Sequence, residues 1–116
     1  MKIISRPILK KFWERAGCED AEQPLLSWFK EVEKANWKNP AEVKKAYGSA
    51  DFVREGRIVF NIGGNKYRLV VWVKYSIALA LIKWVGTHEE YDVIDVTKIG
   101  LPPRSGGSKK SKKRSR

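Results

Sequence analysis

Apolar residues recur every three or four positions through the first third of the chain, which is the spacing of one buried helix face. Ser5 is placed to cap a first helix, Pro7 falls in its first turn, and Gly17 is a suitable terminator. A short apolar segment, residues 2–5, predicts a strand before it. The inward positions of this helix are Ile8, Leu9, Phe12 and Trp13.

Two further helices are predicted before residue 50. The second begins near Asp20, its expected cap. Its apolar positions are Leu25, Trp28, Phe29, Val32 and Ala35. In the third, Asn39 is the cap, Pro40 the first helical residue and Gly48 the terminator. The first half of the chain is therefore expected to be helical.

From Phe52 onward the period changes from that of a helix to the alternation of β-strands. RIVFNI, KYRLVVWVK and IALALIKWV are rich in β-branched and aromatic residues, and GGN between the first two predicts a tight hairpin turn. We expect three consecutive antiparallel strands, at residues 57–62, 66–74 and 77–85. The predicted class is α+β, with N-terminal helices packed against a small antiparallel sheet.

Polar residues interrupt this apolar half at a few positions. Lys66 and Arg68 share one face of the second strand, Lys83 interrupts the third, and His88 and Tyr91 follow just past its end. Antiparallel pairing places the start of the second strand beside the end of the third. The five side chains are therefore expected to form one cluster, without a predicted acidic partner.

A cluster of cations of this kind is suited to a phosphodiester, which would neutralise it. RNA can be cleaved by its own ribose 2′-hydroxyl, which attacks the adjacent phosphorus. That reaction needs a base, an acid for the leaving oxygen and cations around the phosphorane, but it needs no metal and no other cofactor. His88 has the chemistry of a base or an acid, Tyr91 that of a proton donor, and Arg68 that of a phosphate ligand.

The residues alone leave a second interpretation open. A lone histidine at a strand end is often only exposed, a tyrosine there often only packs, and Lys83 reaches solvent along its own stem. On this interpretation the protein is a non-catalytic module that binds RNA or the ribosome.

Charge is distributed unevenly along the 116 residues, whose net charge is +11. Seven of the 24 Lys and Arg residues lie in residues 101–116, which contain no acid. We predict one domain over residues 1–99 and a disordered basic tail over 100–116, which either attracts nucleic acid or only solubilises the chain. The single cysteine, Cys18, excludes an internal disulfide and a multi-cysteine zinc site. No apolar segment is long enough to span a membrane, so a cytoplasmic protein is expected.

The segments RIVFNIGGNKYRLVVWV and IKWVGTHEEYD resemble the HigB toxins, within the RelE-like group of toxin-antitoxin systems. The resemblance extends over about residues 1–99. It implies a RelE-like fold, an mRNA interferase that cuts messages on the ribosome, and a HigA-type antitoxin with a helix-turn-helix. Arg68 and His88 match site positions of these toxins, and Tyr91 lies in the THxEYD segment that HigB proteins share. The basic tail departs from the family pattern.

Overall fold

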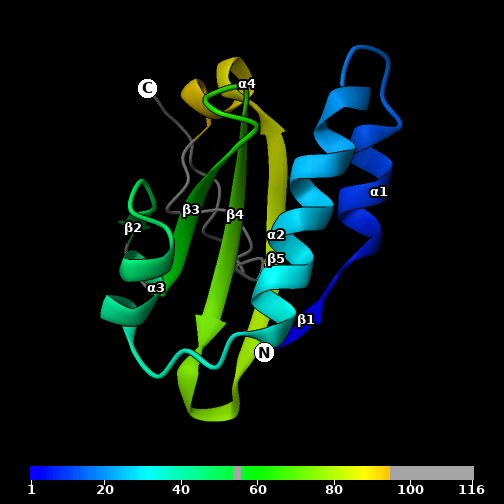
Figure 1. The fold of residues 1–116 in the computed structure, drawn as a ribbon. Coiled ribbons are helices and arrows are strands. Elements are labelled where there is room, and N and C mark those ends of the chain that lie inside the picture. Colours follow the sequence, from blue (N-terminus) through cyan, green and yellow to red (C-terminus); the bar gives the residue numbers. More distant parts are fainter. Residues whose placement is uncertain (54–55, 95–116) are drawn as a thin grey trace, which may run out of the picture.

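The computed structural model describes residues 1–53 and 56–94. A five-stranded sheet with the order β1-β5-β4-β3-β2 runs through it (Figure 1). The strands are β1 (Lys2–Ile4), β2 (Asp51–Val53), β3 (Arg57–Ile62), β4 (Tyr67–Lys74) and β5 (Leu79–Thr87). Neighbours from β2 to β5 are antiparallel, whereas β1 pairs parallel with β5. The α+β class and the three consecutive strands are confirmed. The proposed domain boundary at residue 99 and the basic tail lie outside the described residues.

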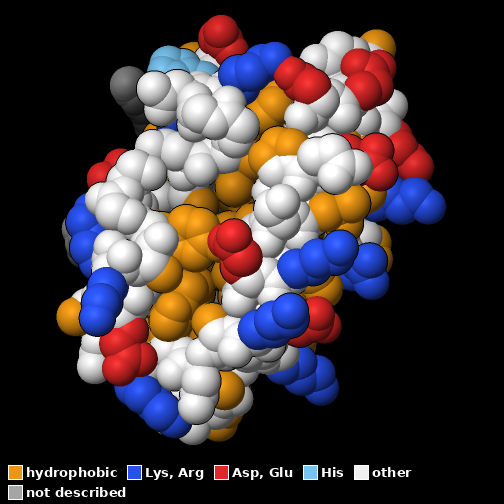
Figure 2. Space-filling model, viewed as in Figure 1, with side chains coloured by type: hydrophobic (Ala, Val, Ile, Leu, Met, Phe, Trp, Pro, Cys, Tyr) orange, Lys and Arg blue, Asp and Glu red, His pale blue; other side chains and the backbone are white. Residues whose placement is uncertain are grey.

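The longer helices cover one face of the sheet, and the last, short helix lies at its end (Figure 1). They are α1 (Pro7–Trp13), α2 (Glu22–Lys34), α3 (Pro40–Ala46) and the short α4 (His88–Asp92), with 3₁₀ turns η1 (Glu19–Ala21) and η2 (Tyr75–Ile77). On this side, apolar side chains show between α2 and α3, while Lys and Arg are spread around the rim and form no single patch (Figure 2). Within residues 1–53 and 56–94, none of the helices has the length and apolar character that crossing a bilayer requires.

The predicted helix starts were correct in one case and wrong in two. Asn39 caps α3 as predicted, since its Oδ1 accepts a hydrogen bond from the backbone N–H of Glu42 at 3.1 Å. Ser5 does not cap α1, because its φ of 75° turns it away and Arg6 occupies the cap position without a side-chain bond. Asp20 does not cap α2 either. It lies in η1, one residue before the cap Ala21, and its carboxylate is bound elsewhere.

The predicted terminators Gly17 and Gly48 lie beyond the observed helix ends. α1 ends at Trp13 and α3 ends at Ala46, with Tyr47 as its cap. Gly17 has a φ of +86°, a backbone conformation that favours glycine, and it lies in the turn that connects α1 to η1.

The β3–β4 hairpin turns at Gly63 and Gly64, whose φ angles of 61° and 70° favour glycine. Beyond the hairpin, β4 pairs with β5 in a register that is interrupted once. Val70 lies opposite Trp84 but Val71 lies opposite Ile82, so Lys83 is an extra residue, a β-bulge. The bulge reverses the alternation, and as a result Trp84 and Gly86 share the sheet face of Arg68.

An aromatic cluster fills the centre of the core, around Phe60 on β3. The Phe60 ring, 1% exposed, meets Trp28 of α2 edge-on with centroids 5.5 Å apart and Tyr47 edge-on at 5.1 Å. Trp37 stacks on it at 6.4 Å. Phe60 therefore joins the sheet to both α2 and the end of α3.

Replacing Phe60 by alanine is expected to lower the free energy of unfolding by about 3–5 kcal/mol, because it empties the centre of this cluster. Phe52, which is 42% exposed on β2, is a matched control. Phe52→Ala should cost about 1 kcal/mol or less. Urea unfolding of both variants measures the difference, and equal losses would contradict this description of the core.

Candidate active site

Arg68 lies on the sheet face opposite the helices, between Asn61 on β3 and Gly86 on β5. Its Nη1 donates to the backbone carbonyls of Asn65 and Tyr67, both at 3.2 Å. These bonds hold the guanidinium against the hairpin. A guanidinium has five N–H donors in a fixed fork, so Arg68 can be anchored in this way and still bind a phosphate.

His88 is the first residue of α4, a helix that the sequence analysis did not predict. The helix begins with a capping box: Thr87 Oγ1 accepts from the N–H of Glu90 at 3.1 Å, and Glu90 Oε1 accepts from the N–H of Thr87 at 2.9 Å. The signal was present in the sequence, since Thr-x-x-Glu is the pattern of such a box. The backbone N–H of His88 also donates to the carbonyl of Lys66 at 2.9 Å, which joins α4 to the hairpin.

The His88 ring has an acidic partner within its own helix. Its Nδ1 lies 3.2 Å from Oδ2 of Asp92, four residues later and therefore on the same side of α4. In the neutral form that carries its proton on Nδ1, the Nδ1–H group donates a hydrogen bond to Asp92, and the lone pair is on Nε2. The sequence analysis missed Asp92, although its spacing of four from His88 was visible.

Tyr91 stands beside Arg68 at this end of the sheet. Its ring packs against Trp84, with centroids 6.2 Å apart. Burial, mainly, raises the pKa of the Tyr91 hydroxyl; the negative charges of Asp51 and Asp92 raise it further and the positive charge of Arg68 lowers it. The phenol therefore keeps its proton at neutral pH. The sequence analysis did not identify Asp51, because the short strand β2 was not predicted.

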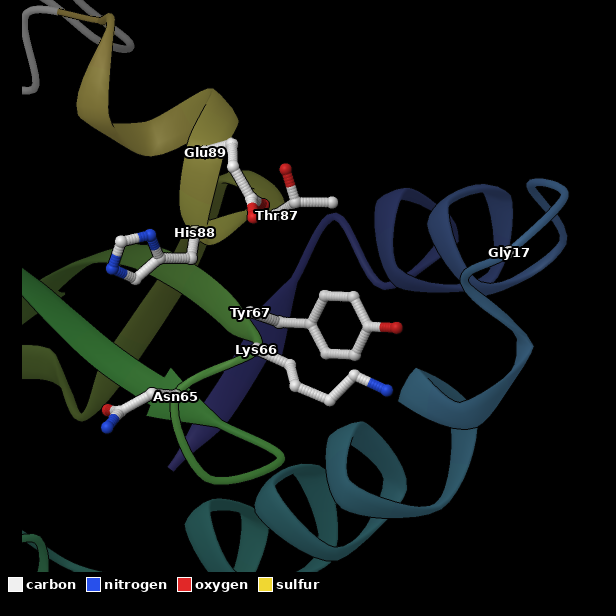
Figure 3. A pocket seen from close by; sticks show the side chains of 7 residues that line it. All are labelled: Gly17, Asn65, Lys66, Tyr67, Thr87, His88 and Glu89. Atoms are coloured by element: carbon white, nitrogen blue, oxygen red, sulfur yellow. The ribbon is translucent and has the colours of Figure 1, made fainter.

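Lys66 points away from the other candidates. Figure 3 shows its side chain and that of Tyr67 directed toward the Gly17 segment, while the His88 ring and Asn65 lie on the opposite side. Lys66 Nζ pairs with the carboxylate of Asp20, which also accepts from the Tyr67 hydroxyl. The expectation of a cluster without acidic partners is thus wrong for Lys66 as well as for His88.

The Asp20 network changes two pKa values in opposite directions. The hydrogen bond from Lys66, and then that from Tyr67, lowers the pKa of Asp20. The bond to Asp20, and then burial, raises the pKa of Tyr67 to about 12. Asp20 is therefore charged and Tyr67 neutral over the physiological range, and the network ties η1 to β4.

Lys83 is the bulge residue of β5, three positions before Gly86, the residue opposite Arg68. The backbone thus places Arg68, His88 and Tyr91 at one end of the β4–β5 pair, whereas the Lys66 side chain turns toward Asp20 and Lys83 lies further along β5. A pocket of about 420 Å³ adjoins this group (Figure 3). It is lined by Gly17, Asn65, Lys66, Tyr67, Thr87, His88 and Glu89.

The arrangement contains the kinds of group that attack by a 2′-hydroxyl would use. Arg68 carries a guanidinium, a group that can bind phosphate, His88 has an imidazole beside a carboxylate, and Tyr91 is a phenol that keeps its proton. Within the described ranges 1–53 and 56–94, no three His, Cys, Asp or Glu side chains form a group that could hold a metal ion.

Comparison with known proteins gives the family of the chain. The family model described as HigB toxin, RelE-like toxic component of a toxin-antitoxin system, matches residues 21–94. The chain belongs to this family. It is 31% identical over 94 residues to the mRNA interferase toxin HigB of Escherichia coli strain K12, an alignment that covers 79% of this chain and 88% of that protein. The mRNA interferase HigB of Shigella flexneri is similar to the same extent.

Gly86 is expected to tolerate no side chain. A Cβ there would lie under 3.0 Å from two ring carbons of Trp84 and from a carboxylate oxygen of Glu90. Gly86→Ala should therefore displace Trp84 and lower the free energy of unfolding by about 1–3 kcal/mol. Gly48→Ala is the control, since nothing lies within 4 Å of its Cβ position. Urea unfolding that shows the same small effect for both variants would refute the close approach of Trp84.

Acid should destabilise the fold through two carboxylates. The pKa of Asp20 is lowered mainly by Lys66, and that of Glu90 mainly by the hydrogen bond from Arg15. Unfolded carboxyls have pKa values of about 3.9 and 4.3, so in this range the folded chain binds fewer protons than the unfolded chain. The stabilisation is fully present above these values and is lost as the pH falls through the lower, folded ones.

The variant Asp20→Asn/Glu90→Gln should accordingly be slightly less stable at pH 7, because both carboxylates are about half exposed and their ion pairs are screened by water, and it should lose less stability between about pH 5 and pH 2. Urea unfolding at intervals of pH measures both. An unchanged slope would show that these two carboxylates do not carry the acid sensitivity.

Proposed function

We propose that this protein is an mRNA interferase that cleaves messages on the ribosome by metal-independent attack of the ribose 2′-hydroxyl. The observation that carries the proposal is the convergence of Arg68, His88 and Tyr91 at one end of the sheet, in a chain of the HigB family. The relatives reported above bear the name mRNA interferase.

The proposed mechanism assigns one role to each residue. Arg68 binds the scissile phosphate and neutralises the charge that grows on its oxygens. His88 takes the proton of the 2′-hydroxyl at Nε2, and Asp92 stabilises the resulting imidazolium. Tyr91 donates its proton to the departing 5′-oxygen, since its raised pKa keeps the phenol protonated until then. The products are a 2′,3′-cyclic phosphate and a 5′-hydroxyl end. Proton exchange with water then removes the proton from His88 and returns one to the Tyr91 phenolate, so that both groups regain their starting forms.

The proposed requirement for the ribosome has a physical reason. In the proposed mechanism Arg68 is the cation that holds the scissile phosphate, and a single phosphate contact gives weak attraction to free RNA. A message already held by the ribosome would arrive in position, at a reduced cost in orientation. Lys66 and Lys83, on either side, are proposed to bind flanking phosphates. Because bacterial ribosomes translate in the cytoplasm, we propose that the protein acts there.

The family also implies an antitoxin partner. We propose that it is of the HigA type, a helix-turn-helix protein that blocks the toxin and represses their shared operon. The rival function, binding without cleavage, predicts that translation stops while the message stays intact.

Primer extension on a defined message in a bacterial translation extract tests the proposal. The parent protein should create new RNA ends only when ribosomes translate. His88→Ala and Tyr91→Phe should each slow cleavage by about 10²–10⁴-fold, because each removes a proton-transfer group. Arg68→Lys, which keeps the charge but loses the fork, should be intermediate between the parent and Arg68→Ala.

Lys74→Ala is the matched control, since Lys74 is an exposed cation at the other end of the same strand. It should cleave like the parent. Circular dichroism must show that all variants are folded. If translation stops while the message stays intact, the protein is a binding module and not an enzyme. If the His88→Ala and Tyr91→Phe variants cleave normally, His88 and Tyr91 have no part in the mechanism.

A further inference from the structure

Helix α4 carries two of the three site residues, although it has only five residues. A helix this short is not stable by itself, so its orientation depends on its attachments. The capping box ties its first turn to Thr87, and Tyr91 packs on Trp84. A third attachment comes from the helical layer, through a residue that lies 75 positions away in the sequence.

This attachment is a two-pronged ion pair between Arg15 and Glu90. Arg15 Nη1 donates to Glu90 Oε1 at 3.2 Å and Nη2 to Oε2 at 2.9 Å. Parallel bonds of this kind fix direction as well as distance. The Arg15 guanidinium also lies 5.1 Å from the ring centroid of Phe12, which is 3% exposed and meets Tyr67 edge-on. The pair therefore anchors α4 to the core.

Glu90 lies at the centre of these attachments. Its Oε1 accepts both from Arg15 and from the backbone N–H of Thr87, and lies against Gly86, the residue opposite Arg68. In sequence it stands between His88 and Tyr91. A change in the position of the Glu90 carboxylate would therefore move both side chains relative to Arg68.

We propose that Arg15 and Glu90 are positioning residues, which orient α4 so that His88 and Tyr91 face a phosphate held by Arg68. The inference rests on the proposed function. The pair is half exposed, with side-chain accessibilities of 48% and 41%, so it adds little to global stability. Its effect should instead appear in the rate, because small errors in the position of reacting groups are costly to catalysis.

Arg15→Met and Lys10→Met test this assignment. Both remove an exposed cation on or next to α1, but Lys10 pairs with Glu14 of the same segment, at 4.0 Å, and not with α4. The test is single-turnover cleavage of a message on stalled ribosomes. At saturating protein, the cleavage rate of Arg15→Met should be lower by about tenfold or more, whereas the protein concentration that gives half the maximal rate should be nearly unchanged. Lys10→Met should match the parent. Arg15→Lys should recover part of the rate, since it restores one hydrogen bond and the charge.

Amide hydrogen exchange supplies a readout that does not depend on activity. The N–H groups of Glu90 and Val93, which bond to Thr87 and to the carbonyl of Glu90, should exchange faster in Arg15→Met than in Lys10→Met, while strand amides stay unchanged. A parent protein that cleaves nothing would overturn the proposed function, and the exchange data would then still decide whether Arg15 holds α4.

Two results would overturn the inference. One is an Arg15→Met variant with the rate and the α4 exchange of the parent. The other is a fall in melting temperature with faster exchange throughout the sheet, which would make Arg15 an ordinary stabilising residue. Slower cleavage with faster exchange confined to α4 would establish the positioning role.

Discussion

The reciprocal pair of hydrogen bonds between Thr87 and Glu90 is the interaction on which the site depends. It turns the chain from a strand into a helix at the residue where His88 begins. Without it, the end of β5 would continue as an extended segment, and His88 and Tyr91 would point to opposite sides. The turn brings both residues to the end of the β4–β5 pair where Arg68 is anchored. The arrangement of the proposed site therefore follows from a local rule of helix capping, reinforced by one long-range ion pair.

Acidic side chains divide the polar residues of this region into two networks with different roles. Asp20 engages Lys66 and Tyr67 on the helical side of the sheet, where it joins η1 to β4. Asp92 engages His88 on the side of Arg68, where it leaves one ring nitrogen directed outward. Tyr67 and Arg68 point to opposite faces because alternate positions of a strand do so, and Lys66, which precedes the strand, turns to the helical side with Tyr67.

Much of the fold was predictable from the sequence because period and turn chemistry are local properties. Alternation predicted β3, β4 and β5, and the Asn39 cap was read correctly. Alternation does not specify direction or register, so the parallel pairing of β1 and the bulge at Lys83 could not be predicted. Arg68 and His88 were placed at one end of the sheet by antiparallel pairing alone. The partners of Lys66 and Glu90 depend on tertiary packing across dozens of residues.

The most direct test of the account is cleavage of a message with one altered sugar. Once the cut site is mapped in a translating extract, the nucleotide on its 5′ side is made with 2′-deoxyribose, which removes the attacking oxygen and leaves the bases unchanged. If the 2′-hydroxyl is the nucleophile, cleavage at this bond disappears while other sites on the same message are still cut. Undiminished cleavage at the altered bond would contradict attack by the 2′-hydroxyl, and with it the roles assigned to His88 and Tyr91.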